Sequence, residues 1–329
     1  MANEKPATSK DVAKLAGVSQ PTVSRAFDPD SPVSPATRAK ILEAAQSLGY
    51  QPNAIARTLL TKQSNIVGVV MANVTGSMFY PQVIEQLTAV LQSHNKQSLL
   101  FNLQPDQPVD DILPQLMGYQ VDGLIIASTT PSTEVVNECI RIGTPVVLFN
   151  RVAHGSQAHA VCCDHEAATR QVAHYLVNQG YQNIAFIGGI ENTETNRLRE
   201  RGFLAGLAEH NQQLLAKVDG NYTYAAGQLG TRRLMAQATK PDAIFCAADI
   251  MALGAMDTLK NELGLQVPQD VAVFGFDDIP SAKWPAYNLS TISQPIELMV
   301  KTAVSLILNP PLESTIRQLQ GELIIRGSA

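Results

Sequence analysis

The sequence predicts a chain in two parts, a small all-α head followed by a larger α/β body built on parallel sheets. In residues 8–48, three amphipathic helical patterns each carry their own start and stop signals. After Lys62, apolar runs of four to six residues alternate with helical patterns, and these runs lack the polar alternation of half-exposed strands. With 329 residues and 45% hydrophobic composition, the chain can bury two or three cores.

The first helix of the head is predicted to start after Thr8. Asp11 stands three residues beyond Thr8, so the two residues form a capping box in which each side chain satisfies a backbone N–H of the other. Gly17 permits the left-handed turn that ends the helix. The apolar residues expected to face the core follow at helical spacing and are Val12, Leu15 and Ala16.

A second helix follows at once, with Ser19 as its cap and Pro21 in its first turn. Its inward residues are Val23, Ala26 and Phe27. Its outward residues are Gln20, Pro21, Thr22, Ser24 and Arg25. A major groove about 12 Å wide admits one helix, and short polar side chains with one arginine suit contacts to base edges and phosphates. The spacing alone also fits an ordinary helical hairpin on a protein surface.

The full pattern over residues 11–27, DVAKLAGVSQPTVSRAF, decides between these readings. It resembles the DNA-binding head of the lac repressor family, which opens with a D-V-A-x-x-A-G-V-S-x-x-T-V-S-R string. The resemblance continues through residues 34–61 and extends over essentially the whole chain. It implies a helix–turn–helix in residues 1–52 that reads DNA through Ser19, Gln20, Pro21, Thr22, Ser24 and Arg25.

The third helix is predicted to start after Ser34, with Pro35 at its first position, and to end at Gly49. Its expected apolar stripe comprises Ile41, Leu42, Ala45 and Leu48. Residues 53–60 could form about two further helical turns, too short to be stable alone in water, and they could equally be a simple linker.

The resemblance favours a hinge helix over residues 53–63. In the family, this segment becomes helical when it pairs with its dimer mate on DNA and inserts a leucine into the minor groove. Leu59 matches that leucine, and Asn53, Ala56 and Arg57 would flank it in the groove. Such a wedge unstacks a base step and kinks the duplex at a cost of a few kcal/mol, which the wider contact offsets.

Charge is distributed unevenly between the two parts. Residues 1–62 hold eight Lys and Arg against five Asp and Glu, a net charge of +3, which leaves −8 for the rest of the chain. A basic head on an acidic body is consistent with phosphate binding at one end and repulsion of DNA elsewhere, although three charges are a weak signal.

In the body, the apolar runs predict strands and the stretches between them predict helices. The expected strands are 66–71, 98–101, 123–127, 146–149, 184–188, 243–247 and 271–276. Helical stretches include 81–94, 166–179 and 250–263. These strands exceed the six or so of one doubly wound sheet, so two similar halves divided near residue 160 are expected.

In the family, the body resembles the periplasmic sugar-binding proteins, with two Rossmann-like lobes joined by three crossings that close on a small ligand. The matching crossings here fall near 160–164, 290–294 and 319–323. This implies an effector-binding and dimerisation domain over 64–329. Its lobe 1 comprises about 64–161 and 293–320, and its lobe 2 comprises about 162–292 and 321–329.

Ligands of such folds bind beyond the carboxyl ends of parallel strands. The family's effector-contacting positions fall on Phe79, Asn150, Arg199, Tyr222 and Asp277. An aromatic wall with amide, carboxylate and guanidinium groups suits a sugar or sugar derivative, and Arg199 could also hold an anionic group. A lone Asp or Asn after a strand is, however, more often a helix cap.

Two departures from the family pattern narrow this expectation. The usual Asn-Asp pair before the M-A-L-G-A helix reads Ala248-Asp249, and the usual N-P-F-F turn reads GSMFY at 76–80. The missing asparagine removes one hydroxyl contact, so the effector is expected to be smaller, more apolar or differently oriented than a plain hexose.

Several other functions are disfavoured by the sequence. The N-terminus lacks a secretory pattern and no apolar stretch reaches the roughly 20 residues that span a bilayer, so we expect a cytoplasmic protein without a membrane partner. The four cysteines lack metal-ligand spacing and are expected to be reduced core residues, with no metal or cofactor. Common nucleotide, hydrolase and metalloprotease motifs do not occur. The histidines at 154, 159, 165 and 174 are expected in loops and on helix surfaces.

The expected function is therefore allosteric control of transcription rather than catalysis. A homodimer would place two recognition helices in successive major grooves of a near-palindromic operator, because one head contacts only a half-site. The chain ends in ELIIRGSA without a leucine heptad, which favours a dimer over a tetramer. Effector binding would change the lobe angle and the hinge helices, and the argument allows either an inducer or a corepressor. A free sugar-binding protein is the alternative of the same fold, and an enzyme is the alternative of another class.

Overall fold

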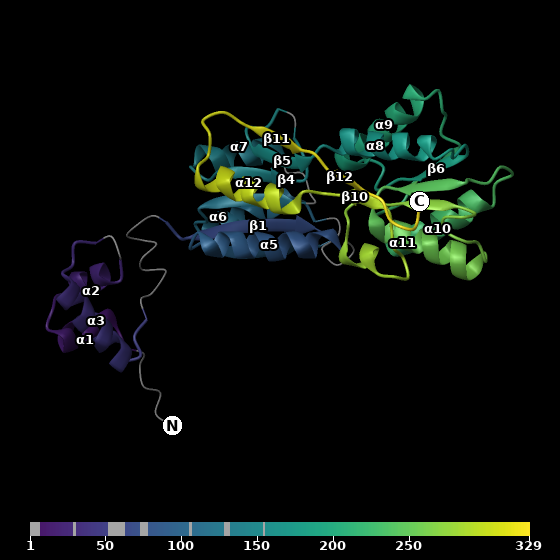
Figure 1. Cartoon of the computed structure of the whole chain (residues 1–329). Helices are drawn as coiled ribbons and strands as arrows, with labels where there is room; N and C mark the ends of the chain where they lie inside the picture. The colour runs from purple at the N-terminus through teal and green to yellow at the C-terminus, as the bar shows by residue number, and fades with distance from the viewer. Residues whose placement is uncertain are drawn as a thin grey trace. The chain divides into compact units, whose positions relative to one another are not determined.

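The computed structural model describes residues 7–28, 31–51, 63–72, 78–104, 107–127, 132–153 and 155–329. The chain divides into two compact units, Met1–Ser64 and Asn65–Ala329 (Figure 1). Of the hinge predicted over 53–63, residues 53–62 lie outside the described residues.

The head contains the three predicted helices, α1 (Ser9–Ala16), α2 (Gln20–Ala26) and α3 (Pro35–Ser47). The capping box between Thr8 and Asp11 is present, and Gly17 takes the left-handed conformation with φ of 67°. Ser34 accepts a hydrogen bond from the Thr37 N–H and so caps α3. The buried core of the head consists of Val12, Ala13, Val23, Ala26, Ile41, Ala44 and Ala45.

Part of the predicted apolar stripe in the head is wrong. Leu15 is 58% exposed, and Leu42 and Leu48 are exposed as well. The buried face of α1 is centred between Val12 and Ala13, and Leu15 lies about a third of a turn away from it. Small alanines thus bring the three short helices together and leave larger leucines outside.

Lobe 1 of the body is built on a six-stranded sheet with the order β11-β5-β4-β3-β1-β2, and every pair in it is parallel. The strands are β1 (Ile66–Ala72), β2 (Gln97–Leu103), β3 (Gly123–Ala127), β4 (Val146–Phe149), β5 (His159–Cys163) and β11 (Ile316–Leu319). One face packs on α5 (Phe79–Ser93) and α12 (Ile296–Leu308). The other packs on η2 (Val109–Asp111), α6 (Leu113–Gly118) and α7 (Thr133–Arg141).

Lobe 2 repeats this architecture on a four-stranded parallel sheet with the order β7-β6-β8-β9. The strands are β6 (Ile184–Ile187), β7 (Ala216–Val218), β8 (Ala243–Cys246) and β9 (Ala272–Phe274). The helices and turns are α8 (His165–Asn178), α9 (Glu194–Glu209), α10 (Tyr224–Met235), α11 (Asp249–Asp257), η3 (Thr258–Glu262) and η4 (Pro280–Lys283). Phe186, Phe203 and Phe245 form the aromatic centre of its core.

The chain passes between the lobes at three places (Figure 1). It leaves lobe 1 after β5 and enters α8, and it returns from β10 (Thr291–Ser293) into α12. It leaves lobe 1 again after β11 and enters β12 (Glu322–Ile324), which pairs antiparallel with β10. The predicted two-lobed body with parallel sheets is confirmed.

Candidate functional site

The outward face of α2 is a polar surface on the head. Gln20, Pro21, Ser24 and Arg25 are exposed, and Thr22 is half-exposed, whereas Val23 and Ala26 on the opposite face are buried. The amide of Gln20 donates to the Ser9 hydroxyl at 3.0 Å, which joins the first turn of α1 to this surface. Its guanidinium, amide and hydroxyl groups are the donors and acceptors that meet base edges and phosphates.

The end of α2 is held in place by Arg38 of α3. One guanidinium nitrogen of Arg38 donates to the Ala26 carbonyl at 2.5 Å and to the Asp28 carbonyl at 2.7 Å, and the other donates to the Ser31 carbonyl at 3.0 Å. The Ala26 carbonyl ends α2 and the other two belong to the loop after it, so none of them has a partner within the helix. Arg38 therefore fixes the orientation of the polar face on the head.

The other predicted DNA contacts lie outside the described residues. Asn53, Ala56, Arg57 and Leu59 all belong to residues 52–62. Their proposed roles rest on the sequence.

In the body, Arg199 and Asp277 lie buried among the polar groups where lobe 2 faces lobe 1, a region called the cleft below. Arg199 is 3% exposed on α9, and its guanidinium lies 3.7 Å above the centre of the Phe276 ring. One terminal nitrogen donates to the Ala247 carbonyl, and the other lies 3.4 Å from the Asp277 carboxylate. Burial raises the pKa of Asp277 to about 6, and the Arg199 charge works against this shift. Asp277 follows β9 with φ of 123°, so the backbone itself turns this carboxylate into the cleft.

Asn150 and Tyr222 also take left-handed backbone conformations, with φ of 58° and 60°. Asn150 follows β4, and its side-chain oxygen is buried with no hydrogen-bond donor among the described residues. Tyr222 lies against Gly189, where an added Cβ would fall 2.0 Å from the phenol ring. Glycine at 189 is therefore needed for the tyrosine to occupy this position.

The predicted aromatic residue Phe79 is buried in the core of lobe 1. Its neighbour Tyr80 packs on it edge-on, with ring centres 5.3 Å apart, and lies closer to the charged groups of the cleft. Burial raises the pKa of both Tyr80 and Tyr222, and the charges of Arg151, Arg199 and Asp277 act on both phenols. Tyr80 thus brings lobe 1 to the charged groups of lobe 2.

Sequence reasoning missed several polar residues of this cleft. The Gln294 amide donates to Asp277 at 2.7 Å, and the Arg199 Nε–H donates to Nδ1 of His165 at 3.4 Å. The side chain of Asn196 accepts the Gly189 N–H at 2.6 Å. Gln294 comes directly after β10, so the rule that residues following strands face the ligand could have found it.

Asp249, the residue of the Ala248-Asp249 pair that matches the family pattern, holds two segments together. Asp249 is completely buried, accepts the Ile279 N–H at 2.9 Å and accepts the Thr291 hydroxyl at 2.5 Å. This carboxyl therefore ties the loop after Asp277 to the crossing strand β10. Burial raises its pKa to about 8.

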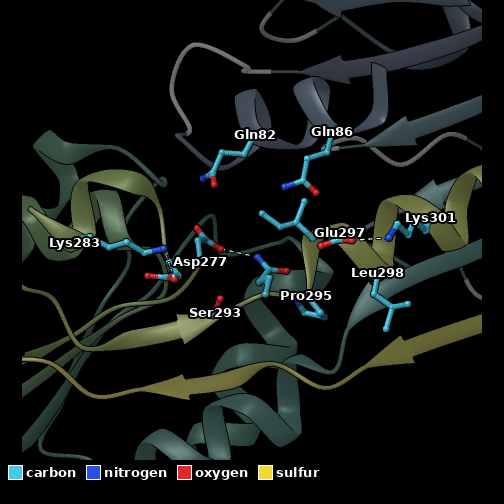
Figure 2. A pocket seen from close by; sticks show the side chains of 12 residues that line it. Gln82, Gln86, Asp277, Lys283, Ser293, Pro295, Glu297, Leu298 and Lys301 are labelled. Atoms are coloured by element: carbon cyan, nitrogen blue, oxygen red, sulfur yellow. Dashed lines mark hydrogen bonds and ion pairs between the residues drawn. The ribbon is translucent and has the colours of Figure 1, made fainter. Parts of the chain in front are cut away.

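A groove of about 400 Å³ opens beside the cleft (Figure 2). Gln82 and Gln86 extend into it from α5, opposite the segment that carries Asp277, and the start of α12 forms its remaining side. Asp277 and Gln294 line this groove as well as the cleft. Lys283 and Lys301 at its rim are paired with Asp278 and Glu297.

The other residue types singled out in the sequence give a mixed result. All four cysteines are buried, as predicted for core residues. The prediction for the histidines is wrong at His159 and His165, which are buried because each begins an element at the lobe crossing, β5 and α8 respectively. His174 lies on the surface of α8 beside Glu209, and residue 154 lies outside the described residues. Across the described residues, no three His, Cys, Asp or Glu side chains are arranged to hold a metal ion.

Comparisons with known proteins match both parts of the chain. Residues 8–53 match the model for bacterial regulatory proteins of the lacI family, and residues 173–329 match the periplasmic binding protein-like domain. The catabolite control protein A of Priestia megaterium is 31% identical over 98% of both chains. The chain belongs to the lacI family of bacterial regulatory proteins.

Other relatives agree with this assignment along the whole chain. The ribose operon repressor of Escherichia coli (strain K12) is 32% identical and covers 98% of this chain and 100% of its own. A crystal structure of the lac repressor dimer bound to operator and the anti-inducer ONPF matches with a TM-score of 0.88 and 28% identity, covering 98% and 99% of the two chains. A complex of the transcriptional regulator CelR with cellobiose matches with a TM-score of 0.73 and 28% identity, covering 98% and 100%.

As a member of this family, the protein is a DNA-binding transcriptional regulator. The polar face of α2 lies within the segment that matches the family's model. Among the helices that the structure describes, none is long and apolar enough to cross a membrane.

Proposed function

We propose that this protein is a repressor that binds a near-palindromic operator as a homodimer and responds to a small effector, a sugar or sugar derivative. The observation that carries the proposal is the exposed polar face of α2, on a head that matches the lacI family from residue 8 to residue 53. The ribose operon repressor, the operator-bound lac repressor dimer and the cellobiose complex of CelR support it.

In this proposal, α2 enters the major groove and its exposed side chains read the operator. Gln20 and Arg25 carry most of the direct base contacts, because Pro21 has no hydrogen to donate and offers apolar contact alone. Ser19, Thr22 and Ser24 position the helix on phosphates. Leu59, flanked by Asn53, Ala56 and Arg57, bends the operator from the minor groove.

The effector binds in the cleft between the lobes. Asn150 and Tyr80 approach it from lobe 1, and Arg199, Tyr222 and Asp277 approach it from lobe 2. Buried polar groups such as the Asn150 oxygen gain a hydrogen-bond partner when a hydroxylated ligand binds, and this favours the closed arrangement of the lobes. Phe79 supports the site by packing behind Tyr80.

Two other functions are compatible with a two-lobed cleft. A free sugar-binding protein would use the same lobes, but it would need no basic head with an exposed recognition helix. An enzyme would turn over its ligand, whereas the proposed regulator binds its effector without changing it. Since operator DNA lies in the bacterial cytoplasm, that is the proposed location.

Selection of bound sequences from random DNA tests the proposal. The purified full-length protein is equilibrated with the library at a stated salt concentration, with and without a small-molecule extract, and the bound DNA is sequenced. A palindrome with a flexible pyrimidine–purine step at its centre is expected. No enrichment under either condition contradicts the function, and enrichment that requires the extract identifies the effector as a corepressor.

A further inference from the structure

The lobe 2 wall of the cleft is formed by the first turns of two helices. α8 begins at His165, two residues after β5 ends, and α9 begins at Glu194 after β6. The two helices lie side by side in Figure 1. Asp164 and Thr193 cap these two helices, and their first turns carry Glu166 and Glu194. The positive charge of this wall therefore comes from Arg199 on α9 rather than from the helix ends.

Two buried side chains on this wall have hydrogens without acceptors. His165 is 2% exposed, and its Nδ1 accepts the Arg199 Nε–H, so its proton is on Nε2, which has no acceptor in the described part of the chain. Burial and the Arg199 charge hold the pKa of His165 well below its ordinary value, and the ring stays neutral.

Asn196 shows the same pattern one turn before Arg199. It is 1% exposed, and its side-chain oxygen accepts the Gly189 N–H, but its NH₂ group has no acceptor among the described residues. Leaving a buried donor without an acceptor is destabilising, because the donor has lost its hydrogen bond to water. Each of these two donors borders a cleft residue, because His165 contacts Arg199 and Asn196 holds Gly189 beneath Tyr222.

Other groups around the cleft are acceptors that lack donors. The side-chain oxygens of Asn150 and Gln294 are buried and lack a donor among the described residues. Asp277 adds a carboxylate, whose Oδ1 atom is shared between Gln294 at 2.7 Å and Arg199 at 3.4 Å. The long distance to Arg199 leaves that guanidinium able to bind a second anion.

We propose that the effector is an anionic sugar derivative, a sugar acid or a sugar phosphate, whose charged group accepts hydrogen bonds from His165, Asn196 and Arg199. Its hydroxyls donate to Asn150, Asp277 and Gln294. A sugar hydroxyl can also accept from these donors, but it offers a single oxygen and brings a hydrogen that itself needs an acceptor. A carboxylate or phosphate offers at least two acceptor oxygens and no hydrogen, so one such group can meet all three donors. This inference rests on the proposed function, because it assumes that the cleft binds the effector.

Fractionation of a small-molecule extract distinguishes failure of this inference from failure of the proposed effector control. Small molecules from the bacterium that encodes the chain are passed over an anion exchanger, and the retained and unretained fractions are each added to the full-length protein on its selected operator. Operator affinity and the midpoint of thermal unfolding are measured. A response to the retained fraction alone supports the inference. A response to the unretained fraction overturns it and leaves effector control intact, and a response to neither overturns effector control itself.

Phosphatase treatment of the retained fraction distinguishes the two sources of the anion. Loss of the response after treatment identifies a sugar phosphate, and an unchanged response identifies a sugar carboxylate.

A matched pair of substitutions tests the residues. Asn196→Asp keeps an oxygen for the Gly189 N–H but replaces the donor with a negative charge, so the response to the retained fraction should weaken at least tenfold. Asn178→Asp adds the same charge at the exposed end of α8 and should respond like the wild type. His165→Phe, which keeps an aromatic ring against Phe276, should also weaken the response. Wild-type responses from folded Asn196→Asp and His165→Phe would overturn the assignment.

Discussion

In the head, the side chains proposed to contact DNA are exposed, whereas in the body the side chains proposed to contact the effector are buried. Gln20, Ser24 and Arg25 extend from a helix whose other face forms the core. Arg199 and Asp277, in contrast, are as buried as the apolar residues around them. DNA is a long polymer and can be bound only at the protein surface, whereas a small effector can be enclosed. Substitutions in the head should therefore change binding without changing the fold, and substitutions in the body should change both.

The largest effect is expected for Arg25→Ala, which tests whether a substitution in the head changes DNA binding without changing the fold. Because the side chain is exposed, the fold and the effector response should persist while specific operator binding is lost. We expect a decrease of at least about 100-fold in affinity, which corresponds to roughly 3 kcal/mol for one good base contact. A mobility-shift titration against operator and random DNA measures it, and unchanged operator affinity would contradict the assignment.

Arg199→Ala and Asp277→Ala test whether substitutions in the body change both effector binding and stability. Each variant should bind operator but no longer respond to the effector. Each should also lose about 3–5 kcal/mol of unfolding free energy, because removal of one partner leaves the other charge buried. Lys217→Ala, which breaks the partly exposed Lys217–Glu200 pair, is the control and should cost less than about 1 kcal/mol. A normal response from both Arg199→Ala and Asp277→Ala would place the effector site elsewhere.

Arg38→Met tests a half-buried residue of the head that is not proposed to contact DNA, and so separates support of α2 from direct contact with the operator. The three carbonyls that Arg38 holds would lose a charged donor, so the stability of α2 should fall by about 2 kcal/mol and operator affinity should fall with it. Hydrogen exchange of the α2 amides in the full-length protein measures the change. The exposed neighbour Lys40→Met is the control, and equal protection of α2 in both variants would show that Arg38 does not fix this helix.

The smallest effect on binding is expected from a pH dependence of stability in the body. Burial raises the pKa of Asp249 from 3.8 to about 8, so between these values the folded protein holds a proton that the unfolded chain has released. The free energy of unfolding should therefore decrease as pH rises from about 4 to about 8 and then level off. Asp249→Asn should remove this contribution, and its stability relative to the wild type should increase from pH 5 to pH 8.5.

Denaturant unfolding of both proteins across this range measures the difference. Asp111→Asn, at an exposed position of lobe 1, is the matched control. A constant difference between the wild type and Asp249→Asn at every pH would show that this carboxyl does not titrate in the range.

The parts of the fold that depend on short-range pattern were predictable. The capping box at Thr8, the turn at Gly17 and the apolar strands of both sheets depend on residues within a few positions of one another. The strand β7 was missed because its three residues, AKV, form no apolar run and are held in place by pairing with β6. Leu15 was misplaced because its exposure depends on which side of α1 meets the other two helices.

The sequence by itself determined the family, the helical head and the two-lobed parallel body, because these follow from local caps, periodicity and a motif of contiguous residues. The tertiary structure alone decided which polar groups share the cleft. His165, Asn196, Tyr80 and Gln294 come from segments up to 214 residues apart in the chain. Their proximity depends on how two sheets, three crossings and several residues in left-handed conformations place them. It therefore cannot be predicted from any short stretch of the sequence.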